Sequence, residues 1–180
     1  EMLRSLVGSE MCIRDRLKML NGLLENKICA SCKICCGFDN TDLWEMPVMN
    51  EKTRRRLAEL RPNVEFIEKD GGFVVDAGNL PDGELFYCPA LDPEKGCMLG
   101  VDKPFDCFIW PFRIMSVDEG LLAITISPVC PEIYSRPLSQ LMDFLSQGLE
   151  KTIYEYAGKH PEIIKPYEHD YPILSIKRLF

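Results

Sequence analysis

The chain has 180 residues, of which 46% are hydrophobic, and its formal net charge is −7 at pH 7. A chain of this size can bury a core without disulfide staples, and its acidic excess, with an isoelectric point near 5.0, argues against nucleic acid as a partner. No run approaches the ~20 consecutive apolar residues that a membrane span needs, so we expect a cytoplasmic protein with no membrane partner.

Residues 1–16 differ in character from the rest of the chain. The stretch "SLVGSEMCIRDR" resembles a recurrent read-through of sequencing-adaptor DNA, and the chain begins with Glu1 rather than Met. We therefore expect residues 1–16 to be a non-native leader and the native protein to start near Leu17. The same stretch is too charged to serve as the apolar region of a secretory signal.

The next part of the chain predicts two helices, a hairpin and a strand. Leucines and a methionine at helical spacing predict a short helix over 17–26. Asn50 can cap a helix over 51–60, which Pro62 ends, and the arginines of "TRRRL" suit its solvated face. The stretch "VEFIEKDGGFVVDAG" alternates around an Asp-Gly-Gly turn, which predicts a β-hairpin. "GELFYC" predicts a further strand.

The C-terminal half predicts two more strands and a long helix. Residues 88–107 are rich in turn formers and form a loop that needs something to order it. "CFIWPFRIMSV" and "GLLAITISPVC" predict two strands, of which Pro111 limits the first to an edge or a bulge. A long helix is predicted over 136–158, capped by Ser135. The tail, 159–180, is predicted to be irregular and to lie on the surface.

These elements together predict one small α+β domain over residues 17–158, with short antiparallel strands and flanking helices. No internal repeat or low-complexity segment divides the chain. We expect the cysteine-rich loops of this domain to be stabilised by a metal.

Nine cysteines are the outlying feature of the composition. A small secreted protein uses cysteines as disulfides, whereas a cytosolic protein uses them for metal binding or catalysis. The length of the chain and the lack of a signal sequence favour metal. Cys12 falls in the suspected leader, and eight cysteines remain: Cys29, Cys32, Cys35, Cys36, Cys88, Cys97, Cys107 and Cys130.

The stretch "CASCKICC" joins two overlapping CxxC units. Two residues between ligands let the backbone turn so that both sulfurs point at one centre, and Cys29, Cys32 and Cys35 can therefore converge on one ion or cluster. The run resembles the bacterial ferredoxin pattern, in which CxxCxxC supplies three ligands. Cys36 points in another direction from Cys35, which leaves it as a ligand of a second centre or as a spare.

The distal cysteines Cys88, Cys97, Cys107 and Cys130 are separated by eight, nine and twenty-two residues, with no CxxC among them. Zinc fingers usually bring their ligands in paired knuckles, so this spacing is not a zinc-finger pattern. Singly buried thiols or disulfides are the alternatives for these four. A nucleophilic thiol needs a nearby base, and the chain has only two histidines, both in the tail.

These residues resemble a known family. The order C-x2-C-x2-C-C, then Cys88-Pro89-Ala90-Leu91, Cys97, Lys103-Pro104, Cys107, Pro111 and Cys130 is similar to the CxxCxxCC family, the YkgJ-like cysteine-cluster proteins. The resemblance covers about residues 29–131 and implies a zinc- or iron-chelating domain with eight cysteines. The family usually has Arg-Pro where this chain has Lys103-Pro104, and Cys-Arg where it has Cys107-Phe108. A related flagellin lysine methylase implies iron–sulfur chemistry, but no methyl-donor domain is visible here.

Thiolate ligation suits zinc or an iron–sulfur cluster. Our hypothesis is a [4Fe–4S] cluster held by Cys29, Cys32 and Cys35, with Cys107 as fourth ligand because it lies between rigid prolines. The other cysteines form a second site or support the first, and Lys27, Lys33 and Arg113 can offset thiolate charge. A redox or cluster-dependent role, a zinc-stabilised interaction module and an iron–sulfur methyltransferase remain open. The sequence identifies no substrate, and a protein partner is left open.

Overall fold

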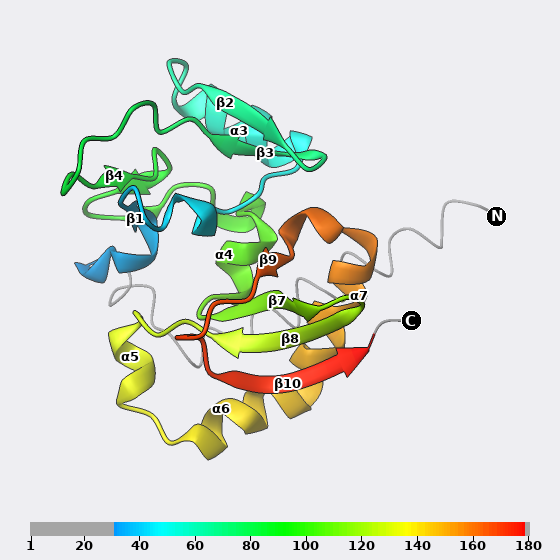
Figure 1. Ribbon diagram of the computed structural model, residues 1–180. Coiled ribbons are helices and arrows are strands. Elements are labelled where there is room, and N and C mark those ends of the chain that lie inside the picture. The colour runs from blue at the N-terminus through cyan, green and yellow to red at the C-terminus, as the bar shows by residue number, and fades with distance from the viewer. Residues whose placement is uncertain (1–30, 179–180) are drawn as a thin grey trace.

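The computed structural model describes residues 31–178, and it is a mixed α+β fold with short antiparallel strands (Figure 1). The predicted helix over 17–26 lies outside the described residues, as do Cys12 and Cys29. The helices are α3 (Glu51–Leu60), α4 (Phe105–Ile109), α5 (Pro131–Tyr134), α6 (Leu138–Phe144) and α7 (Glu150–Lys159), with the π-helical turn η5 (Leu145–Leu149) and the 3-10 turns η2 (Ile34–Cys36), η3 (Leu43–Glu45), η4 (Gly100–Asp102) and η6 (Pro161–Ile163). The strands are β1 (Gly37–Phe38), β2 (Phe66–Lys69), β3 (Gly72–Val75), β4 (Phe86–Tyr87), β5 (Leu91–Asp92), β6 (Gly96–Cys97), β7 (Phe112–Asp118), β8 (Leu121–Ile126), β9 (Lys165–Pro166) and β10 (Ile173–Arg178).

The C-terminal part, residues 105–178, is built on a four-stranded sheet of order β10-β8-β7-β9. We call it the sheet lobe. β7 and β8 form an antiparallel hairpin whose turn contains Gly120 at φ 67, in the left-handed region that glycine adopts most easily. β10 pairs antiparallel with β8, whereas β9 pairs parallel with β7.

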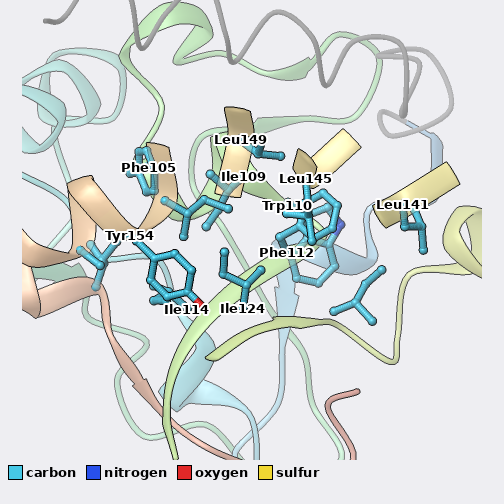
Figure 2. Close-up of a cluster of buried hydrophobic side chains, with 14 of the residues drawn as sticks. Phe105, Ile109, Trp110, Phe112, Ile114, Ile124, Leu141, Leu145, Leu149 and Tyr154 are labelled. Carbon is cyan, nitrogen blue, oxygen red and sulfur yellow. The ribbon is translucent and has the colours of Figure 1, made fainter. Parts of the chain in front are cut away.

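One face of this sheet carries the larger hydrophobic core. Side chains alternate between the two faces of a strand, and Phe112, Ile114, Ile124 and their neighbours all point to the same face. Figure 2 shows them meeting leucines of α6 and η5 and Tyr154 of α7. Ile124 and Ile153 are fully buried in this cluster.

The opposite face of the sheet is buried as well, but it mixes polar side chains with the apolar Met115 and Ala123. Arg113 of β7 and Thr125 of β8 lie opposite each other in the hairpin, and both are buried. Thr125 donates its hydroxyl to the sulfur of Met115 at 3.1 Å. This face is where the chain's N-terminal part contacts the sheet.

The N-terminal part, residues 31–104, has shorter elements and a core of its own. We call it the cysteine lobe. Its strands form three two-stranded ladders, β1 with β4, β2 with β3, and β5 with β6. A second cluster of buried side chains, including Phe38, Met49 and Leu57, holds them to α3.

The helix and hairpin predicted in the cysteine lobe are confirmed. α3 spans Glu51–Leu60, and the side chain of Asn50 accepts a hydrogen bond from the Thr53 N–H at 2.9 Å. β2 and β3 form the predicted hairpin around Asp70 and Gly71, both at positive φ. The strand predicted in "GELFYC" is β4, which is two residues long.

Three predictions in the sheet lobe are wrong. The first strand was expected across "CFIWPFRIMSV", but Phe105–Ile109 is the helix α4, and the strand begins at Phe112. Phe105 and Ile109 are four residues apart and share one buried helical face. Pro111 lacks an N–H for the ladder, so the strand begins after it.

The predicted helix over 136–158 is broken in two. Gly148 has φ 106 inside it, and a π-helical turn separates α6 from α7. Ser135 ends α5 instead of capping a long helix, and Leu138 is exposed. Glycine is the residue that most readily adopts this positive φ, so Gly148 accounts for the break.

The predicted irregular tail contributes two strands to the sheet. β9 and β10 both come from residues 159–180, and β10 forms one edge of the four-stranded sheet. Ile173 and Ile176 are exposed, so the tail shows little of the alternation by which a half-buried strand is recognised.

No helix within residues 31–178 is long and apolar enough to cross a membrane.

Candidate metal centre

Both lobes contribute cysteines, but the described thiols do not form one cluster. Cys32, Cys35 and Cys36 lie in and before η2, Cys88 follows β4, Cys97 ends β6, Cys107 lies in α4 and Cys130 precedes α5. All seven are free thiols, so the disulfide alternative finds no pair within residues 31–178. The eighth predicted ligand, Cys29, lies outside them.

A β-ladder brings the motif residues of η2 beside the distal cysteines. Gly37 of β1 pairs with Tyr87 of β4. The Cys88 N–H donates to the Cys36 carbonyl at 2.8 Å, so residues separated by fifty positions in the chain become neighbours. The hydrophobic residues that form β1 and β4 thus join the CxxCxxCC run to Cys88.

A second short ladder links Cys88 to Cys97. The Leu91 N–H donates to the Cys88 carbonyl at 2.9 Å, and Leu91 pairs with Cys97 across β5 and β6. Gly96, at φ 77, makes the tight turn that lets β6 return. Cys88 and Cys97 both pack against the core of the cysteine lobe.

The sheet lobe supplies the remaining two thiols. Cys107 lies in α4, directly after the fully buried Asp106. Cys130 belongs to the hydrophobic core of the sheet lobe, and Cys35 packs against that same core. Burial raises the pKa of Cys130, although a hydrogen bond with Trp110 lowers it in part.

The thiols of Cys35 and Cys36 differ in pKa. Their sulfurs are 3.9 Å apart. The hydrogen bond with Cys36, helped by the positive charges of Arg113 and Lys103, lowers the pKa of Cys35 to about 7. The same hydrogen bond and burial raise the pKa of Cys36, so Cys35 is the thiol of this pair that ionises first.

The other thiols hold their protons more tightly. Burial raises the pKa of Cys88 to about 11, with the charges of Cys97 and Cys35 adding to the effect. Burial also raises the pKa of Cys107 well above its ordinary value, and the charges of Cys88 and Cys97 contribute. Thiols of both lobes therefore lie within electrostatic range of one another. A bound cation is what would favour their ionised forms together.

The thiols fit a metal centre in chemistry but are not arranged as a closed ligand set. Free thiols are the soft ligands that zinc and iron–sulfur clusters take. Within residues 31–178, however, no three Cys, His, Asp or Glu side chains are placed so that they could hold an ion. A metal would have to draw these thiols closer together.

A buried ionic network beside the thiols was only partly foreseen from sequence. The Arg113 guanidinium donates to Glu45 Oε2 at 3.1 Å and lies 4.6 Å above the Trp110 ring. The Tyr171 hydroxyl also donates to Glu45. Sequence analysis singled out Arg113 but missed Glu45 and Tyr171. The one feature of the sequence that pointed to this network was Arg113, a charged residue inside the apolar run "PFRIM".

The network continues to Lys165 and Asp106. The Lys165 ammonium donates to the Met46 carbonyl at 2.8 Å, and Asp106 accepts from the Val48 N–H at 3.2 Å. Burial lowers the pKa of Lys165 to about 8, which the nearby Asp106 opposes. Each of these bonds joins the two lobes, so the boundary between the lobes is held by buried polar groups.

A pocket of about 260 Å³ opens at this boundary. Cys32, Cys35, Arg113 and Trp110 are among the residues that line it. Glu45 also lines it, which places part of the ionic network in its wall.

No protein-family model matches this chain, and neither the curated proteins nor the solved structures contain a match. The resemblance to the cysteine-cluster proteins therefore rests only on the order and spacing of the cysteines and of the residues named with them.

Proposed function

We propose that this protein binds a metal through its cysteines, with a [4Fe–4S] cluster as the first candidate. Cys29, Cys32 and Cys35 would supply three ligands and Cys107 the fourth. The cluster would provide a one-electron redox centre. The remaining thiols, Cys36, Cys88, Cys97 and Cys130, would support it or hold a second ion.

The observation that carries the proposal is that the fold brings free thiols from distant parts of the chain within electrostatic range of one another, although the described thiols do not form one cluster. The pairing of β1 with β4 is local evidence for it, because it joins Cys36 to Cys88. Buried thiols whose charges oppose one another would raise the free energy of the ionised protein, and a bound cation would relieve this cost.

Positive charge near Cys35 also supports the proposal. Arg113 and Lys103 both favour the thiolate of Cys35. Phe105 and Trp110, which flank Cys107 in the sequence, have buried aromatic side chains. Apolar walls exclude water, which protects a cluster and sets its potential.

Zinc is the second candidate, and the shortness of the ladders favours it. An isolated two-stranded ladder is only marginally stable in water, and the cysteine lobe contains three of them. A structural zinc ion contributes on the order of 10 kcal/mol to folding. Such an ion would order this lobe without any catalysis.

The experiment is purification without oxygen, followed by an absorption spectrum and analysis of iron, sulfide and zinc. A broad band near ~400 nm with about four iron and four sulfide per chain would support the cluster. A colourless protein with one or two zinc ions would support the structural site. Protein with neither metal, and with its thiols oxidised in pairs, would contradict the proposal.

Two variants locate the ligands. Cys32→Ser changes an exposed thiol and should abolish metal binding, so full metal content in this variant would falsify its assignment as a ligand. Cys12→Ser is the matched control, because Cys12 lies in the suspected leader. Loss of metal in that control would overturn our interpretation of residues 1–16.

A further inference from the structure

The pocket at the lobe boundary has the composition of a small-molecule site. Four large apolar side chains that line it, Ile34, Leu85, Tyr87 and Val129, are exposed by 41% to 54% of their surface. Exposed apolar residues scattered singly need no explanation, but apolar residues gathered around one hollow are typical of a binding site.

A buried cation forms part of the same wall. Arg113 is only 4% exposed, and its Nε has no hydrogen-bond partner within residues 31–178. Its Nη2 donates to Glu45, and its plane lies above Trp110. A guanidinium has five N–H donors in a fixed plane, so one carboxylate does not exhaust its capacity.

The other charges around the pocket are few. Lys33 brings a second positive charge and Asp42 a negative one. Glu45 is already engaged by Arg113 and by the Tyr171 hydroxyl. Burial raises the pKa of Asp42.

We propose that this pocket binds a small carboxylate with an apolar body, whose carboxylate contacts Arg113 and whose body lies against Tyr87 and the neighbouring apolar side chains. Arg113 suits this ligand because its planar donors match a carboxylate in geometry. The volume of about 260 Å³ is at the lower end for ligand pockets, so the ligand is the size of an aromatic acid or an amino acid derivative.

The position of the pocket adds a consequence that rests on the proposed function. Cys32 and Cys35 line the pocket and are proposed metal ligands. A carboxylate bound there would lie directly beside the metal centre. Binding itself depends on Arg113 and the apolar wall and does not require the metal.

The test is calorimetric titration of the purified protein with benzoate, with benzamide and with acetate. Benzoate should bind with a dissociation constant of about millimolar, and at least about tenfold more tightly than either of the others. Equal binding of uncharged benzamide would overturn the role of Arg113. Equal binding of acetate would overturn the role of the apolar wall, and no binding of benzoate would overturn the proposal.

Four variants sharpen the test. Arg113→Lys keeps the charge beside Glu45 but loses the planar donors, and should weaken benzoate binding about tenfold. Asp42→Asn keeps the acceptor for the Asp39 N–H and should strengthen it. Tyr87→Ala removes an exposed part of the apolar wall and should weaken benzoate binding. If Arg113→Lys does not fold, Asp42→Asn and Tyr87→Ala test the proposal in its place. Arg55→Gln, which removes an exposed charge of α3, should leave binding unchanged.

Metal analysis of the same samples separates this inference from the proposed function. Protein that lacks metal but binds benzoate would support the pocket and contradict the metal centre. Protein that contains metal but does not bind benzoate would overturn only the pocket.

Discussion

The two lobes of this protein are held together by different means. In the sheet lobe, the four-stranded sheet and the helices α4 to α7 bury one apolar cluster (Figure 1, Figure 2). In the cysteine lobe, the strands occur only as two-stranded ladders around a smaller cluster. The lobe with the weaker core carries five of the seven described thiols.

This difference indicates how stability is divided within the chain. The sheet lobe has the long β-branched strands and the amphipathic helices that bury enough apolar surface to fold. The strands of the cysteine lobe are only two to four residues long, and α3 is the one α-helix that lies wholly within its described residues. This lobe meets the sheet lobe through charged and polar groups such as Glu45 and Lys165. We expect the cysteine lobe to depend more than the sheet lobe on two supports that join them, namely the proposed metal and the buried ionic network.

Removal of the proposed metal should produce the largest effect, and the cysteine lobe should lose its structure while the sheet lobe keeps its own. A structural metal contributes on the order of 10 kcal/mol, which is comparable with the entire stability of a typical domain. Treatment with a chelator should therefore remove hydrogen-exchange protection from α3 and β3 while β7 and β8 keep theirs. Simultaneous loss of protection in β3 and β8 would show that the lobes unfold as one unit. It would contradict the proposed difference in how the two lobes are stabilised.

Breaking the ionic network should have the next largest effect. Glu45→Gln leaves Arg113 buried without its paired carboxylate, and removal of one partner of a buried pair typically costs about 3 to 5 kcal/mol. The measurement is the free energy of unfolding in urea. Glu51→Gln is the matched control, because Glu51 pairs with Arg54 and Arg55 on an exposed helix face, and it should change little. Equal effects of the two variants would contradict the importance of the network.

Two core substitutions compare the lobes directly. Leu57 and Ile124 are each fully buried, one in each lobe, and each change to alanine should cost about 2 to 5 kcal/mol in the metal-bound protein. After metal removal, Ile124→Ala should keep its cost, whereas Leu57→Ala should have none, because its lobe is already unfolded. The measurement is again urea unfolding of each variant with and without chelator. A retained cost for Leu57→Ala would show that the cysteine lobe folds without metal.

The sequence predicted elements where local chemistry decides the structure. Asn50 predicted the start of α3, and the Asp-Gly-Gly turn predicted the β2–β3 hairpin. The break at Gly148 was missed because a single glycine inside a helical pattern is usually tolerated. β10 was missed because its pairing with β8 is a long-range contact that leaves little pattern in its own residues.

The candidate site, like the fold, has parts that a local sequence pattern predicts and parts that depend on long-range contacts. The CxxCxxCC run is a local signal, and it singled out the thiols as candidate ligands, which stays a prediction. The ionic network of Glu45, Tyr171 and Lys165 joins residues more than a hundred positions apart, and no local pattern marks such partners. The pocket beside Arg113 likewise exists only through the packing of η2, β4 and β7.

The buried lysine of the network should make stability depend on pH. Burial lowers the pKa of Lys165 from 10.5 to about 8 in the folded protein. Between about pH 8 and 10.5 the unfolded chain therefore binds more protons at this residue than the folded protein, and the free energy of unfolding should rise with pH across that window. The rise is at most about 3 kcal/mol, and the pKa of about 8 from which it follows already includes the opposing effect of Asp106.

Lys165→Met isolates this contribution from those of other titrating groups. The variant removes the ammonium and keeps an apolar side chain of similar length, so it should lose the part of the rise that belongs to Lys165. The difference in unfolding free energy between the two proteins, measured at several values of pH from 7 to 10.5, is the decisive quantity. A difference that stays constant over this range would mean that Lys165 titrates as freely in the folded protein as in the unfolded chain. The boundary between the lobes would then be hydrated rather than buried, and its polar bonds would add little to the support that we assign to the cysteine lobe.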